Sequence, residues 1–334
     1  MIAASRVRRR FRRGCRSRGL RPRDALATVR PAPNGSRATV SPMKISSVSA
    51  VKAVLTGSSF VVPPLPPLTP NCMSWLRSAA PRFANGLTHT RRRRIVEEML
   101  QSLDVPSLRK AAEKRTGAIL AAAGERPIDV MADIARFVPV EVLADALDLT
   151  AVQAADVVAA AAAYPPASSV SPCAVSAVER LVKACGGSRD EPTAARIGIL
   201  VQAADATAGL IGTTAVRWLR TTSRTLVEDA LADTQRHDPP VRITKRLAIS
   251  NCAAVGVTSR AGDQLLEVDL AAASGADPSL AFGYGPHACP GRELASTIAA
   301  GVVEQLRRHR LAEPDIAYLP SPNLRVPEAV WVIR

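Results

Sequence analysis

Residues 282–295 restrict the possible fold of this chain more than any other segment. They read Phe-Gly-Tyr-Gly-Pro-His-Ala-Cys-Pro-Gly-Arg-Glu-Leu-Ala. The one cysteine in this stretch, Cys289, lies among the glycines Gly283, Gly285 and Gly291. Glycine permits positive φ angles and close approach of the backbone. The segment therefore predicts a tightly turned loop whose N–H groups can point at the cysteine sulfur.

The residues on either side of the loop add to this pattern. From Gly291 the sequence reads as a helix through Leu306, so the positive end of that helix would lie near Cys289 and lower the pKa of its thiol. Phe282 would form an apolar cover over the sulfur, and a dry shell of that kind influences the redox potential of a metal. The alternative interpretation is a buried free cysteine after a glycine-rich turn. That alternative would not explain why so many specific residues occur at fixed positions around Cys289.

This loop resembles, without a gap, the haem-binding loop of the cytochrome P450 family, Phe-Gly-x-Gly-x-His-x-Cys-x-Gly-x-x-Leu-Ala. The resemblance is to the soluble bacterial branch. It implies a haem b cofactor whose iron is held by the Cys289 thiolate. The other loop residues that it places at the cofactor are Phe282, Gly283, Gly285, His287 and Gly291.

Basic residues elsewhere match the family's contacts to the haem propionates. His89 and Arg93 are one helical turn apart, so both can face one anionic ligand. Arg246 matches the family's propionate arginine, and a guanidinium binds carboxylates bidentately. His287 is a further propionate residue from the loop. The alternative for the basic run 91–94 is a solvated helix face or a phosphate-contact patch.

Asp233 and Arg236 match a Glu-x-x-Arg pair that has a structural role in the family. An acid and a base three residues apart on a helix can meet, and aspartate only shortens the reach. We therefore expect Asp233 and Arg236 to pair.

The apolar run 197–218 is long enough to suggest a membrane span, but its middle is polar. We interpret it as a long core helix, similar to the family's helix across the distal face of the haem. There the resemblance implies catalytic roles for an acid, Asp205, and a hydroxyl, Thr207. The position between them, which usually carries a threonine that helps deliver protons, is Ala206.

The remaining patterns predict a mainly α fold with a small β component. The resemblance makes it a cytochrome P450-like fold, truncated at the N-terminal sheet, the F/G region and the meander. The predicted helices are 48–55, 90–103, 107–123, 128–149 with a break at Pro139, and 151–164. The predicted strands are 242–248, 265–270 and 329–333. The proline-rich stretch 61–70 predicts a stiff extended connector.

Residues 1–43 hold twelve arginines and one acid, a net charge of +11 that leaves +4 of the total of +15 for the rest. Their composition cannot form a core, so we predict a disordered arm followed by a single haem-binding domain, 44–334. The arm has either no function or a role in contacting nucleic acid or a membrane surface.

The resemblance implies a monooxygenase that inserts one oxygen atom from O2 into a small hydrophobic organic substrate. No flavin or nicotinamide fingerprint is visible, so the electrons would come from a ferredoxin-type donor with its reductase, and Arg292, Arg307 and Arg308 are candidate docking charges. Six scattered cysteines fit a reducing cytoplasm. The alternatives are a degenerate haem binder or sensor, or a nucleic-acid-associated protein.

Overall fold

The structure is a computed structural model, and it describes residues 42–334 except 68, 222–225, 255–256 and 260–263. The predictions for the arm lie outside the described residues, apart from its last two positions. Met43 is the first residue of strand β1 (Met43–Ile45), so the folded part starts before residue 44.

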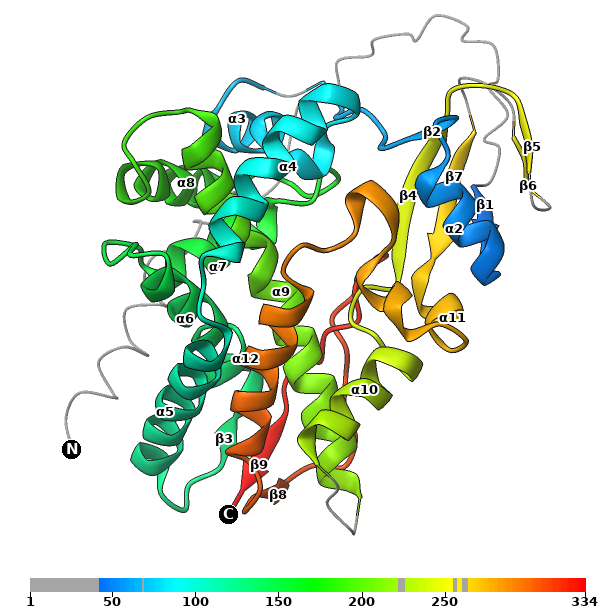
Figure 1. Ribbon diagram of the computed structural model, residues 1–334. Coiled ribbons are helices and arrows are strands. Elements are labelled where there is room, and N and C mark those ends of the chain that lie inside the picture. The colour runs from blue at the N-terminus through cyan, green and yellow to red at the C-terminus, as the bar shows by residue number, and fades with distance from the viewer. Residues whose placement is uncertain (1–41, 68, 222–225, 255–256, 260–263) are drawn as a thin grey trace, which may run out of the picture. The chain divides into compact units, whose positions relative to one another are not determined.

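Helices make up most of the described chain, as the sequence predicted (Figure 1). The long central helix α9 (Glu191–Arg220) packs against α6, α7, α10 and α12. The other α-helices are α2 (Val48–Thr56), α3 (Cys72–Ala79), α4 (Gly86–Gln101), α5 (Val105–Ala123), α6 (Val138–Ala146), α7 (Ala154–Ala163), α8 (Pro172–Ala184), α10 (Val227–His237), α11 (Leu270–Ser274) and α12 (Arg292–Glu304).

Helix α9 is the one helix in the described part of the chain that is long and apolar enough to cross a membrane. Within its most apolar 18-residue stretch, 78% is buried inside the protein. Asp190 caps its start by accepting a hydrogen bond from the Thr193 N–H at 2.8 Å. These features fit the core helix that the sequence predicted.

Two small sheets and a hairpin complete the fold. The first sheet has the order β1-β7-β4-β2, in which β7 (Leu265–Asp269) and β4 (Ile243–Ala248) are antiparallel neighbours. Strands β1 and β2 (Phe60–Val61) form its edges, and neither was predicted. The second sheet has the order β3-β9-β8 (Ile128–Asp129, Trp331–Ile333 and Arg310–Leu311). Strands β5 (Cys252–Ala254) and β6 (Val257–Ser259) form the hairpin.

The helical core and the first sheet lie on opposite sides of the loop before α12 (Figure 1). Helices α5 and α12 approach closely at Gly301, where a Cβ atom would lie 2.7 Å from the Arg109 carbonyl oxygen. The predicted helix 128–149 is wrong at its start, where Ile128–Asp129 form β3, and a π-helix at Met131–Ala135 precedes α6. The break lies before α6 and not at Pro139, which is in the first turn of that helix. Residues 62–67 form neither helix nor strand, in agreement with a connector.

Candidate functional site

The loop before α12 has the tight turns that its glycines predicted. Gly283 and Gly285 have φ angles of 76° and 69°. A Cβ atom on Gly285 would lie 2.8 Å from Thr56 Cγ2 and 3.0 Å from the Leu55 carbonyl oxygen. Glycine is therefore required at 285 for conformation and for space. Gly291 is not required for its backbone conformation, because its φ of −101° is accessible to any residue.

Cys289 lies just before α12 and faces opposing influences on its thiol. Solvent reaches one side of the residue, while protein surrounds the others closely enough that burial raises the pKa of the thiol. The Gly291 N–H, Arg93 and Arg292 act in the opposite direction. The start of the helix thus acts in the predicted direction, but burial outweighs it and the pKa of the free thiol is raised. A bound cation would reverse this balance, since a coordinating thiol is deprotonated outright.

A cluster of basic side chains adjoins the loop, and its four members were all predicted from the sequence. The rings of His89 and His287 lie 3.9 Å apart between centroids. Arg93 donates a hydrogen bond to the Ala288 carbonyl oxygen at 2.6 Å. Arg246, from β4, acts electrostatically on both histidines. Elements far apart in sequence thus bring these four side chains together next to the cysteine loop.

Arg246 shows what this cluster is suited to bind. Arg246 is 5% exposed. Its Nη1 donates hydrogen bonds to Thr244 Oγ1 at 3.3 Å and to the Lys245 carbonyl oxygen at 2.8 Å. No carboxylate of the described residues forms an ion pair with it. Burial lowers the pKa of Arg246 to about 10. A buried cation without an anionic partner is costly, so the site fits a buried carboxylate from a ligand.

The histidines are held neutral by the same surroundings. Burial lowers the pKa of His287 to about 3, and His89, Arg246 and Arg93 add to the effect. Burial also lowers the pKa of His89, which is 6% exposed. Both rings can therefore offer an N–H donor to an anion without adding charge. This chemistry fits the propionates of a haem.

The middle of α9 presents the three predicted catalytic positions. The helix is continuous from 191 to 220, so no local unwinding moves Thr207 towards the direction of Ala206. Thr207 is 3% exposed, so protein encloses its side chain almost completely. Burial raises the pKa of Asp205, while Arg136 lowers it. The helix therefore offers an acid that protonates more readily than usual, with a methyl group as its neighbour.

The predicted pairing of Asp233 with Arg236 is wrong. Asp233 forms an ion pair with Arg217 of α9 and lies 3.3 Å from His237 Nε2. Arg236 donates to the Gly275 carbonyl oxygen at 3.2 Å. The partner of Asp233 is therefore Arg217 from the neighbouring helix α9, and not Arg236 from its own helix. The pair still ties α10 to the fold, but through α9.

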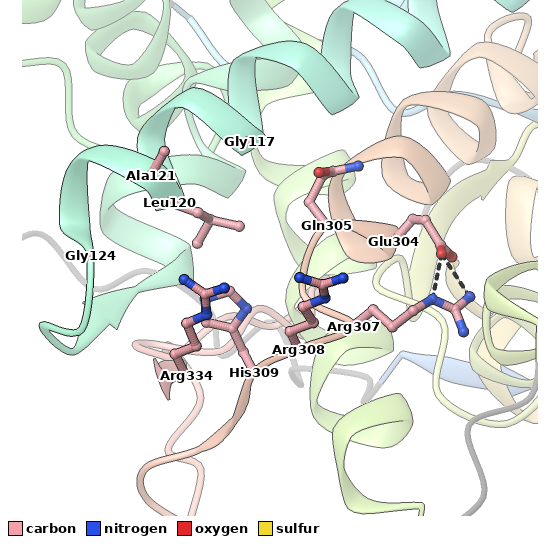
Figure 2. Close-up of a pocket in the computed structure, with 10 residues that line it drawn as sticks. All are labelled: Gly117, Leu120, Ala121, Gly124, Glu304, Gln305, Arg307, Arg308, His309 and Arg334. Carbon is pink, nitrogen blue, oxygen red and sulfur yellow. Dashed lines mark hydrogen bonds and ion pairs between the residues drawn. The ribbon is translucent and has the colours of Figure 1, made fainter.

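The three arginines proposed as docking charges lie at the two ends of α12. Arg292 lies at the start of α12, near Cys289, while Arg307 and Arg308 follow its end, roughly 20 Å away at 1.5 Å per residue. Figure 2 shows these two arginines in a surface hollow of about 350 Å³ with Arg334 and the end of α5. Arg307 pairs there with Glu304 at 2.6 Å. Of the three, only Arg292 lies near the cysteine loop.

Sequence reasoning missed the residues that hold the site together. Glu97 accepts from Arg93 Nε at 2.7 Å, a spacing of four residues that the sequence could have revealed. Helix α2, whose end meets Gly285, gave no such signal because the contact is non-local.

Comparison with solved structures identifies the fold. P450BioI in complex with an acyl carrier protein ligated to hexadec-9Z-enoic acid matches with a TM-score of 0.74 at 19% identity, over 90% of this chain and 94% of that one. The Tepidiphilus thermophilus P450 haem domain gives 0.70 at 17% identity, over 87% and 88%. The P450 CREJ complex with (4-ethylphenyl) dihydrogen phosphate gives 0.67 at 16% identity, over 87% and 91%. No family model and no curated protein matches the sequence. The chain therefore has a cytochrome P450 fold, and identities this low establish the fold alone.

Proposed function

We propose that this chain is a haem-thiolate monooxygenase that inserts one oxygen atom from O2 into a small organic substrate. The observation that carries the proposal is that the loop of Cys289 brings His287 against His89, next to the buried Arg246, which has no anionic partner among the described residues. A porphyrin with a central iron and two propionates has the chemistry to satisfy Cys289 and Arg246 at once. The fold supports the same conclusion independently of these residues.

On the proximal side, each residue has a separate role in this proposal. Cys289 supplies the thiolate, and the Gly291 N–H and the start of α12 stabilise its charge. Arg246, His89 and His287 bind the propionates, with Arg93 nearby. Phe282 contributes its carbonyl oxygen, which accepts from the Cys289 N–H at 2.8 Å. When bound, the haem would supply the iron on which O2 is activated, and a thiolate ligand favours cleavage of the O–O bond.

On the distal side, Asp205 and Thr207 are the residues proposed to handle protons. The raised pKa of Asp205 favours a carboxyl that exchanges protons with its surroundings. Ala206 has no hydroxyl to orient water, so ordered water or a hydroxyl of the substrate would complete the route.

Electrons would come from a separate acidic protein of the ferredoxin type with its reductase. Arg292 is exposed next to the cysteine loop and is the docking charge that remains near the proposed haem. One similar structure holds an acyl carrier protein with its fatty acyl group. A carrier-bound acyl substrate is therefore a specific option beside a free small hydrophobic one. A cytoplasmic location belongs to this proposal.

The alternative is a haem-binding protein or sensor without turnover, and Ala206 is the observation that favours it. Purified protein reconstituted with haem, ferredoxin, reductase and NADPH should form an oxygenated product from at least one compound that shifts its spin state. The Cys289→Ala variant is the control for reductant-driven background. Haem binding with no product from any such compound would support the sensor.

The nucleic-acid alternative depends on the arm. If it is correct, nucleic-acid binding should be salt-dependent and should disappear when residues 1–43 are deleted. The monooxygenase proposal expects the deletion to leave the haem spectrum unchanged.

A further inference from the structure

The peptide unit between Ala288 and Cys289 is held at both ends. Its N–H, on Cys289, donates to the Phe282 carbonyl oxygen at 2.8 Å. Its carbonyl oxygen, on Ala288, accepts from Arg93 Nη1 at 2.6 Å. The peptide group is planar, so two opposing hydrogen bonds fix the orientation of the plane immediately before the cysteine Cα. This orientation restrains the backbone from which the Cys289 side chain projects, and thereby limits where the sulfur can lie.

Arg93 is in turn anchored on its own helix. Its Nε donates to Glu97 Oε1 at 2.7 Å, and its side chain is 17% exposed. A guanidinium is a planar group with five donors in fixed directions, so one arginine can bind a carboxylate and a carbonyl simultaneously. Two of its nitrogens are used by these contacts.

The next pair along α4 has the same chemistry without the contact to the loop. Arg94 Nε donates to Glu98 Oε1, also at 2.7 Å and four residues away. Its side chain is 79% exposed, and it makes no other hydrogen bond to the described residues. The two pairs differ in what the arginine contacts, because only Arg93 also reaches the cysteine loop.

We propose that Arg93 and Glu97 form a strap that positions Cys289 as an iron ligand, in addition to any contribution of Arg93 to propionate binding. Arg93 is a positioning residue: it acts through the Ala288 carbonyl, and Glu97 acts through Arg93. The proposal rests on the proposed function for the role of the sulfur. The strap itself is a property of the protein without haem.

Hydrogen exchange tests the strap without depending on haem. In the Arg93→Gln variant of the full chain, the backbone N–H of Cys289 should exchange with deuterium about tenfold faster than in the wild type, the order expected for losing one charged hydrogen bond. Arg93→Lys should do the same, because the three donors of an ammonium lie on one nitrogen, whereas Arg93 reaches Glu97 and Ala288 from two separate nitrogens, Nε and Nη1. Arg94→Gln, the matched control, should remain within about twofold of the wild type.

Haem-loaded protein provides the second readout. The reduction potential and the Soret position of the ferrous carbon monoxide form should shift in Arg93→Lys and Glu97→Ala, and should not shift in Arg94→Gln. Wild-type exchange at Cys289 in Arg93→Lys, or equal exchange in the Arg93 and Arg94 variants, would overturn the strap. Faster exchange with no thiolate spectrum in the wild type would leave the strap intact and overturn the haem-thiolate function.

Discussion

The two sides of the proposed site differ in how completely the chain prepares them. On the proximal side, Cys289 has a fixed peptide plane before it and an N–H donor from Gly291 near its sulfur. On the distal side, α9 presents Asp205 without an adjacent hydroxyl, because position 206 is alanine. The comparison teaches that holding a haem and delivering protons to it are separable demands on one fold. Under the proposed function, the chain's own side chains would meet the first demand, and water or substrate would supply part of the second.

The largest expected effect is at Gly285, where the loop meets α2. In Gly285→Val, the positive φ of 69° and contacts as short as 2.8 Å would destabilise the fold by about 2–4 kcal/mol. Chemical denaturation measures the loss. Gly291→Ala is the control, because a Cβ there makes an ordinary 3.7 Å contact with Leu100 and should cost less than about 1 kcal/mol. Equal losses in both variants would show that the loop has no specific requirement at 285.

Arg246 separates haem retention from protein stability. Arg246→Met should accelerate haem dissociation about 10–100-fold, since a charged hydrogen bond contributes about 1.5–3 kcal/mol. The same change removes a buried cation that has no anionic partner in the described part of the chain, so the haem-free protein should be equally or more stable. The two measurements are transfer of haem to apomyoglobin and the melting temperature of the haem-free protein. Unchanged haem transfer would contradict the propionate role.

A smaller effect is expected at the distal side. Ala206→Thr should raise product formed per electron consumed a few-fold for a substrate without a hydroxyl, since general acid–base assistance depends on a positioned proton donor. The test is coupling efficiency on one identified substrate, with the spectrum of Cys289 ligation as the control. Equal or poorer coupling would mean that protons already reach the site without a hydroxyl at 206.

The smallest effect concerns the contact between the two sides. Glu191, at the start of α9, pairs with Arg91 and Arg92 of α4 at 2.6 and 2.8 Å, and these arginines lower the pKa of its carboxyl to about 2. A lowered folded-state pKa gives stability that is present above the unfolded value near 4.5 and is lost as the pH falls towards 2. In Glu191→Gln this part of the acid sensitivity should disappear, at a cost below about 1 kcal/mol at pH 7. Denaturation curves at pH 7 and pH 3 for both proteins check the sign.

The sequence was most informative where the determining contacts are local. Three features depend only on residues that are close together in the sequence. They are the loop around Cys289, the four-residue spacing of His89 and Arg93, and the apolar length of α9. Short edge strands escaped prediction, because β1 and β2 pair with residues about two hundred positions away. The partner of Asp233 is also non-local. It pairs with Arg217 and not with Arg236, because the packing of α10 on α9 places Arg217 next to it. Residue types near the site were predictable, and their partners across the fold were not.

The most direct test of the account is the spectrum of the ferrous carbon monoxide complex. Full-length protein reconstituted with haem, reduced and exposed to carbon monoxide should give the strongly red-shifted Soret band of thiolate ligation, and Cys289→Ala should lose it. Cys185→Ala, at a buried thiol to which the structure assigns no ligand role, should retain it. Persistence of the band in Cys289→Ala, or its absence in a wild-type protein that binds haem, would contradict the claim that Cys289 is the iron ligand.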